Sequence, residues 1–231
     1  MAQLVTDFGE IMEVEINPLL VTEDRVIAAE ARVRVSPSDR PPEARLAILP
    51  YPKSLEEEFT AADGRTLLLR PIVPEDEPAL LETFDDLTQE EIRLRFHSPL
   101  KVLTHMMAAR FTQLDYDREM ALVLTEPGTP GKTPIHGVVR LHTDPDHEHG
   151  DFAILVQHAM TGKGLGTHML ERIIDYARQR GLTEIGGDVL NENKVMLALA
   201  RKLGFTVKPK LHDRGVMRIT LPIGRGGDRT P

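Results

Sequence analysis

The pattern of apolar and polar residues predicts a regular domain from about residue 64 to 222. Its clearest helix lies between residue 165 and Gly181, where apolar residues step by four, one, three, one and three positions. Further helices are predicted over 74–87, 89–97, 103–111 and 196–203. Strands are predicted over 66–70, 120–125, 135–142, 151–157, 184–190, 205–207 and 216–221. Taken in chain order, these elements predict an α+β arrangement.

The first 35 residues carry a different pattern, which predicts a pair of strands joined by a turn. Ile11–Ile16 alternates apolar and acidic residues, Asn17-Pro18 turns the chain, and 26–35 forms a second apolar run. A segment of this size cannot bury a self-sufficient core, because domains below roughly 40 residues usually need metals, disulfides or a partner. We therefore interpret residues 1–35 as the end of a larger module.

Residues 36–63 are predicted to link these two parts. Ser36–Pro42 holds three prolines, 46–52 is expected to lie extended on a surface, and Glu56-Glu57-Glu58 is expected to be a solvated charge run. Residues 1–63 hold 13 acidic and 6 basic residues, a net charge of 6 − 13 = −7, whereas the rest of the chain is nearly neutral. Residues 223–231 are expected to form a frayed tail.

Composition excludes several classes of function. The net charge of −8 argues against nonspecific nucleic-acid binding, and no apolar run approaches the roughly 20 residues that cross a bilayer. The absence of cysteine excludes disulfides, thiolate metal sites and a cysteine nucleophile. Acidic residues interrupt the N-terminus where a signal sequence would be apolar, so we expect a cytoplasmic protein.

A glycine-bearing loop, Gly162-Lys-Gly-Leu-Gly166, separates a predicted strand from the helix at 165. Glycines allow close approach of a ligand to the backbone, and free N–H groups at a helix start can hold phosphate oxygens. The spacing matches neither a Walker A sequence nor GxGxxG. From the loop alone, anion binding and a simple strand-to-helix turn are both open interpretations.

Together with Asn193 and Leu203-Gly204-Phe205, the stretch from Asp151 to Gly166 resembles the acyl-CoA-binding core of GNAT-family N-acetyltransferases. The resemblance covers roughly residues 64–222. It implies the GNAT acyl-CoA N-acyltransferase fold, a central mixed sheet flanked by helices, and acetyl-CoA as acyl donor. The family's loop glycines fall on Gly164 and Gly166, while Thr161 replaces the family's leading Gln or Arg. The positions that the resemblance assigns to the cofactor are Leu155, Val156, Gln157, Thr161, Gly162, Lys163, Gly164, Leu165, Gly166, Thr167 and Asn193.

A narrower resemblance joins the two parts of the chain. Residues 115–123, 138–140 and 200–205 are similar to bacterial protein lysine acetyltransferases whose GNAT domain follows an NDP-forming acyl-CoA synthetase module. Residues 13–21 and 28–32 resemble the last strands of the ATP-grasp region of such synthetases, so 1–35 is read as an ATP-grasp-like remnant. The glycine-rich and lysine-bearing remainder of that module is absent, so no nucleotide binding is expected. A strand pair packing on the GNAT domain is the alternative for this segment.

Transfer to a lysine requires a base, because an ammonium of pKa near ~10.4 is about one part in a thousand neutral at pH 7. The resemblance places the family's catalytic Glu at Asp151, eleven residues before Gly162, and burial is expected to raise the basicity of this carboxylate. Glu119 is the second candidate base. The alternative is that Glu119 forms a salt bridge to Arg118, Arg140 or another cation and has no catalytic role. The family's tyrosine acid falls on Ala200, so solvent is expected to protonate the leaving thiolate.

Histidines and acidic residues cluster between residues 142 and 149. They are His142, Asp144, Asp146, His147, Glu148 and His149. Their spacing matches no closed zinc template, and polar residues are usual in a hairpin turn. We therefore predict no metal site.

The resemblance implies acetyl or short-acyl transfer to a protein lysine, with AMP-forming acyl-CoA synthetases as the target class. The alternatives are a small-molecule amine N-acetyltransferase and a noncatalytic acyl-CoA sensor. A deep acidic acceptor slot would favour the small molecule, and a flat, shallow one would favour a protein. No nucleic-acid or membrane partner is expected.

Overall fold

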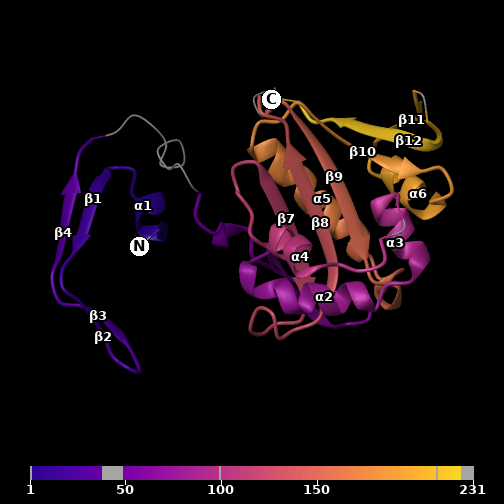
Figure 1. The fold of residues 1–231 in the computed structure, drawn as a ribbon. Helices are drawn as coiled ribbons and strands as arrows, with labels where there is room; N and C mark the ends of the chain where they lie inside the picture. Colours follow the sequence, from indigo (N-terminus) through magenta and orange to yellow (C-terminus); the bar gives the residue numbers. More distant parts are fainter. Residues whose placement is uncertain (1, 38–48, 99, 212, 225–231) are drawn as a thin grey trace. The chain divides into compact units, whose positions relative to one another are not determined.

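A computed structural model describes residues 2–37, 49–98, 100–211 and 213–224 of the chain. The chain divides into two units, Met1–Tyr51 and Pro52–Pro231. Figure 1 shows both units as ribbons with their helices and strands labelled. The second unit carries the elements predicted between residues 66 and 222, and none of the helices in the described ranges is long and apolar enough to cross a bilayer.

The first unit is a short helix followed by two antiparallel strand pairs. Strand β1 pairs with β4, and β2 pairs with β3. The elements are α1 (Ala2–Asp7), β1 (Ile11–Ile16), β2 (Leu19–Val21), β3 (Val26–Ala28) and β4 (Ala31–Val35). The single second run expected over 26–35 is wrong, since the chain breaks it into β3 and β4. Among the described side chains of this unit only Ile11 is buried, as expected for a segment too short to enclose a core.

The second unit is built on a mixed sheet of eight strands in the order β11-β12-β10-β9-β8-β7-β6-β5. Only the pair β9–β10 is parallel, and every other pairing is antiparallel. The strands are β5 (Glu57–Thr60), β6 (Thr66–Pro71), β7 (Glu119–Thr125), β8 (Ile135–Thr143), β9 (His149–Val156), β10 (Glu184–Leu190), β11 (Thr206–Lys210) and β12 (Asp213–Pro222). The predicted mixed sheet flanked by helices is therefore confirmed.

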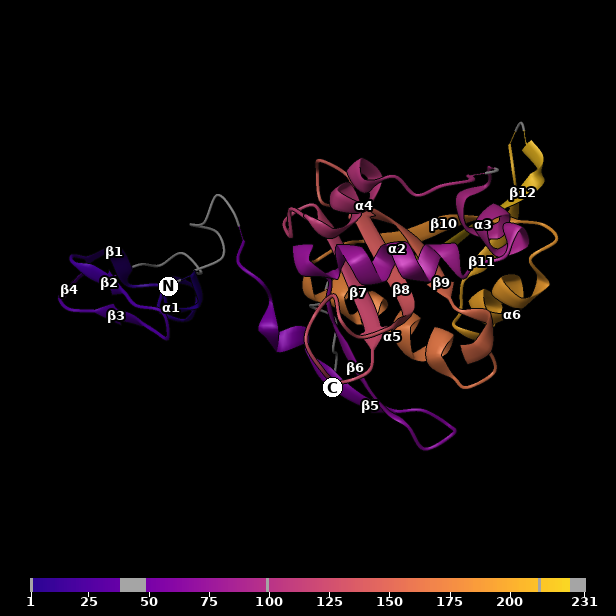
Figure 2. The ribbon, with the colours of Figure 1, turned by 60° about the horizontal axis from the view of Figure 1, so that its bottom comes forward.

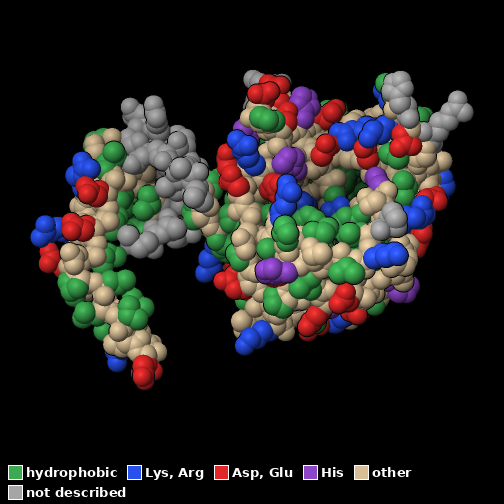
Figure 3. Space-filling model, viewed as in Figure 1, with side chains coloured by type: hydrophobic (Ala, Val, Ile, Leu, Met, Phe, Trp, Pro, Cys, Tyr) green, Lys and Arg blue, Asp and Glu red, His purple; other side chains and the backbone are tan. Residues whose placement is uncertain are grey.

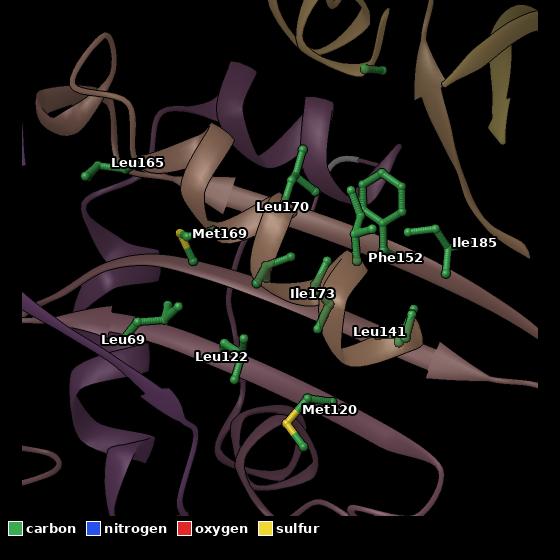
Figure 4. Packing of buried hydrophobic residues seen from close by; sticks show 14 of the residues in the cluster. Leu69, Met120, Leu122, Leu141, Phe152, Leu165, Met169, Leu170, Ile173 and Ile185 are labelled. Carbon is green, nitrogen blue, oxygen red and sulfur yellow. The ribbon is translucent and has the colours of Figure 1, made fainter. Parts of the chain in front are cut away.

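Helices cover both faces of this sheet (Figure 2), and Figure 3 shows the side chains in the view of Figure 1, coloured by type. They are α2 (Glu77–Asp85), α3 (Gln89–Phe96), α4 (His105–Thr112), α5 (Leu165–Gln179) and α6 (Lys194–Lys202). On one face, the apolar stripe of α5 places Met169, Leu170 and Ile173 against Leu122 and Leu141 of the sheet (Figure 4). Each such fully buried side chain contributes about 1.5–3 kcal/mol to folding.

Helices α2, α3 and α4 cover the opposite face. Phe84 and Ile92 pack there on Val123 of β7. Helix α3 begins with a capping box, in which Thr88 accepts from the Glu91 N–H and the Glu91 carboxylate accepts from the Thr88 N–H. The helix start predicted at residue 74 is a short 3-10 turn that passes into α2.

Of the expected solvated run Glu56-Glu57-Glu58, Glu56 and Glu58 are exposed as predicted, whereas Glu57 is half-buried because Glu57–Thr60 forms the edge strand β5. Glu57 and Phe59 point to the α5 side, where Phe59 stacks on His168 at 4.1 Å and Glu57 lies 2.8 Å from Arg172. The three acidic residues obscured the alternating burial pattern of a strand, in which the inward-facing residues contact side chains of α5. The expectations for 38–48 lie outside the described residues.

Candidate functional site

The pairing between β9 and β10 is short, and the two strands separate beyond it. Only His149–Asp151 pairs with Glu184–Gly186. At Gly187 the strands are still close, because a Cβ there would lie 2.9 Å from the Phe152 carbonyl oxygen. Farther along, a cleft opens between Phe152–Ile154 on β9, 187–189 on β10 and the start of α6. A parallel pair that parts in this way leaves room for a linear ligand between the strands.

The glycine loop lies at the end of β9, as predicted. A 3-10 turn, His158–Met160, leads into Gly162 and Gly164, whose φ angles are +77° and +85°. Gly164 is also the N-cap of α5 and supplies no side chain to the helix start. Within the described residues, no hydrogen bond uses the N–H groups of Gly162, Lys163 or Gly164. The first N–H groups of α5 likewise have no partner within the helix.

These groups fit the diphosphate of CoA. A Cβ at Gly162 or Gly164 would meet no atom within 4 Å, so the outer side of the loop is open. Backbone N–H donors at a helix start, aided by the helix dipole, are a suitable cradle for phosphate oxygens. Leu165 is buried in the core, so it can offer only its N–H to a ligand.

Lys163 turns toward the β5–β6 turn, where its Nζ lies 3.0 Å from the Asp63 carboxylate. Hydrogen bonds from Arg65 and Lys163 hold the pKa of Asp63 far below its usual range. Thr161 stands where the resembled family has Gln or Arg. Its hydroxyl donates to the His158 carbonyl oxygen at 2.8 Å. Both side chains are therefore tied to the protein, and the donors of the loop that have no partner among the described residues are backbone N–H groups.

Of the predicted cofactor residues outside the loop and α5, Asn193 lines the cleft between β9 and β10, whereas Leu155, Val156 and Gln157 are not among the described residues that line it. Leu155 faces the α2–α4 side, Val156 packs against the α5 core, and the Gln157 N–H donates to His136. Asn193 lines the cleft and caps α6, with its Oδ1 accepting from the Met196 N–H at 3.0 Å. One end of its amide is thus occupied by the cap.

Both candidate bases lie in one row across the sheet, with His142 between them. Glu119 on β7 pairs with His142 on β8, which in turn pairs with Asp151 on β9. The Glu119 carboxylate is 3.2 Å from Arg140 Nη1 and 3.1 Å from His142 Nδ1. The salt bridge that was the alternative interpretation of Glu119 is therefore present.

Asp151 is not buried, which corrects the expectation that burial raises its basicity. Its side chain is 64% exposed and lies 2.5 Å from the Arg218 guanidinium on β12. This pair reaches across β10 because Gly186 has no side chain; a Cβ there would lie 3.2 Å from Arg218 Cζ. The row is therefore open to solvent at Asp151.

The histidines between residues 142 and 149 are paired separately. His142 lies near Glu119, His147 near Asp117 and His149 near Asp144, at 3.1, 3.7 and 3.2 Å. The described parts of the chain contain no group of three or more potential metal ligands.

A second cavity, which sequence reasoning missed, lies between the sheet and α2–α4. Phe84, Phe96, Phe111 and Leu155 line it, together with two arginines, Arg95 and Arg140. Arg140 donates to the Phe111 carbonyl oxygen at 2.5 Å, and burial lowers its pKa. Arg95 also lines the cleft between β9 and β10, so it borders both cavities. The only sequence signal was the position of Arg140 on the same strand face as His142.

The sequence matches two family models. Residues 66–206 match the acetyltransferase (GNAT) domain, and residues 1–35 match an ATP-grasp domain. Over 143 residues, the chain is 24% identical to an acetyltransferase of Pseudomonas aeruginosa, which covers 62% of this chain and 76% of that protein.

Solved structures share the fold of the second unit. The GNAT domain of S. lividans PAT is 28% identical with a TM-score of 0.68, over 75% of this chain and 99% of that chain. A spermidine N-acetyltransferase from Vibrio cholerae, solved with CoA and spermine, is 18% identical with a TM-score of 0.55, over 69% of this chain and 96% of that one.

Proposed function

The chain belongs to the acetyltransferase (GNAT) family of acyl-CoA-dependent N-acetyltransferases, and we propose that its acceptor is a lysine side chain of a protein. The observation that carries the proposal is the exposure of the acceptor end. The side chains of Asp151 and His142 are 64% and 61% exposed, so no deep slot encloses them. A lysine on a protein surface can reach such a shallow row, whereas a small amine would find few walls to bind it.

On the donor side, we propose that acetyl-CoA lies with its diphosphate on the N–H groups of 162–167. Its pantetheine arm would then follow the cleft between β9 and β10, past Asn193. The open space outside Gly162 and Gly164, and the unused N–H groups, support this position. The thioester would lie beside Ala153 and Leu155, next to the row of candidate bases.

The chemical step is direct transfer, since no cysteine is present to form an acyl-enzyme. The neutral lysine nitrogen attacks the thioester carbonyl carbon, a C–N bond forms, and the C–S bond breaks as CoA leaves. The lysine proton passes to Asp151 through water, and the thiolate takes a proton from solvent. Glu119 is the alternative base. Both carboxylates are paired, Asp151 with Arg218 and Glu119 with Arg140 and His142, but Asp151 is the more exposed, at 64% against 31%.

For the target, we propose AMP-forming acyl-CoA synthetases. The support is the resemblance of residues 115–123, 138–140 and 200–205 to bacterial lysine acetyltransferases, joined to the ATP-grasp match at 1–35.

The test is incubation of the full chain with labelled acetyl-CoA and a bacterial lysate, followed by mapping of the labelled lysines. We expect label on a few lysines, including one of a synthetase of this class. Label confined to small amines would overturn the proposal in favour of a small-molecule enzyme. CoA binding without transfer to any amine would indicate a sensor.

A further inference from the structure

Arg95 on α3 lies at the meeting point of the two cavities and has no counter-ion among the described residues. Its guanidinium lies 4.9 Å from the centre of the Phe96 ring and lines both the β9–β10 cleft and the α2–α4 cavity. Burial and the nearby charge of Arg140 lower its pKa to about 10, so it remains a cation at neutral pH.

Across the described residues, no carboxylate lies within ion-pair distance of Arg95, and no hydrogen bond involves its side chain. Its neighbours on the same helix differ. Arg93 pairs with Glu90 and Glu192, as is usual for an arginine near acidic residues. Arg140, the second arginine of the cavity, is satisfied by Glu119 and the Phe111 carbonyl oxygen. Of the two arginines that line this cavity, Arg140 therefore has partners within the described residues and Arg95 has none.

The charge of this cavity decides which substrate group can enter it. A lysine ammonium would meet two guanidinium groups and no carboxylate in the lining, so like-charge repulsion excludes it. The acceptor must instead approach the row of Glu119, His142 and Asp151. The α2–α4 cavity therefore remains for the acyl group, whose methylene carbons suit the walls formed by Phe84, Phe96 and Leu155.

We propose that this enzyme takes acyl-CoA donors whose acyl group ends in a carboxylate, such as succinyl-CoA, with Arg95 binding that carboxylate. Planar guanidinium and carboxylate groups form paired charge-assisted hydrogen bonds, which are strongest where water is largely excluded. The inference rests on the proposed position of CoA and deepens the proposed function by naming its donor class. The bonds made and broken are those of acetyl transfer, and the acyl carboxylate takes no part in them.

The test measures binding, without an acceptor, in the full chain. Calorimetric titrations compare succinyl-CoA with butyryl-CoA, which has the same number of acyl carbons and no charge. We expect succinyl-CoA to bind about tenfold or more tightly, from a charged hydrogen bond in a partly buried site. Arg95→Met should abolish or reverse this preference, Arg95→Lys should keep part of it, and Arg110→Met, on the exposed side of α4, should leave it unchanged.

Equal or tighter binding of butyryl-CoA by the unaltered protein would overturn the inference, whether or not any variant folds. Retention of the full preference in folded Arg95→Met would also overturn it. The result is independent of the acceptor. Failure to label any protein lysine would reject the proposed function and leave the donor preference standing, whereas loss of the preference would leave lysine acetylation standing.

Discussion

The proposed donor site, called the donor end, and the proposed acceptor site, called the acceptor end, use different parts of the polypeptide. At the donor end, Gly162 and Gly164 present backbone N–H groups, and the side chains of Thr161 and Lys163 are tied back to the protein. At the acceptor end, the available groups are side chains from three strands. The donor end therefore depends on one short segment of sequence, whereas the acceptor end depends on the register of the whole sheet.

The largest effect is expected at the acceptor end. Asp151→Asn removes the proposed base and should lower kcat/KM on a peptide acceptor by at least about 100-fold, the lower bound for general-base catalysis. The defect should shrink as pH approaches the lysine pKa of about 10.4, because more acceptor is already neutral. Steady-state kinetics across a pH series measure both effects.

Two further variants sharpen this prediction. Asp151→Glu restores the family's usual side chain and should retain activity. Normal turnover in Asp151→Asn together with inactive Glu119→Gln would move the base to β7. Activity in both would mean that solvent deprotonates the lysine.

At the donor end, Gly164→Val should weaken CoA binding by about 10- to 100-fold, because the side chain would occupy the space of the phosphates and remove charge-assisted hydrogen bonds. Gly181→Val is a matched control. Gly181 follows the other end of α5, has a φ of +78° against +85° at Gly164, and also has open space around its Cβ position. Both variants carry similar backbone strain, so an equal loss of CoA affinity in the two would remove the loop from the account.

Truncation tests where the catalytic unit begins. A chain starting at Pro52 keeps β5 and should keep its turnover, since no residue of the proposed site precedes it. A chain starting at Gly64 loses Leu55 and Phe59, which pack on the core, and should lose about 2–3 kcal/mol of unfolding free energy. Urea denaturation measures the unfolding free energy of both truncated chains. Equal values would show that β5 does not stabilise the sheet.

The smallest effect concerns His168, which lies on α5 under Phe59. Burial lowers the pKa of His168 below its ordinary value of 6.5. The unfolded chain therefore binds the proton first, so stability is complete above about pH 6.5 and falls as pH drops below it. His168→Gln should reduce the difference in unfolding free energy between about pH 7.5 and about pH 5.5. If the difference in unfolding free energy between the two pH values is unchanged in His168→Gln, groups other than His168 cause it.

The same contrast explains what the sequence could predict. The glycine loop, α5 and β10 follow from local patterns, since glycines, an apolar stripe and a strand run lie within a few residues of one another. The exposure of Asp151 and its pairing with Arg218 depend on β12 and on the missing side chain at Gly186, so no local pattern contained them. Arg95 was missed for the same reason, because only the packing of α3 on the sheet brings it to the cavity.

The division between a backbone donor end and a side-chain acceptor end is tested most directly by titrating acetyl-CoA into Asp151→Asn. We predict that this variant binds acetyl-CoA with the dissociation constant of the unaltered protein, while its turnover falls by about 100-fold or more. Loss of acetyl-CoA affinity in parallel with turnover would contradict it, because Asp151 would then belong to the donor site.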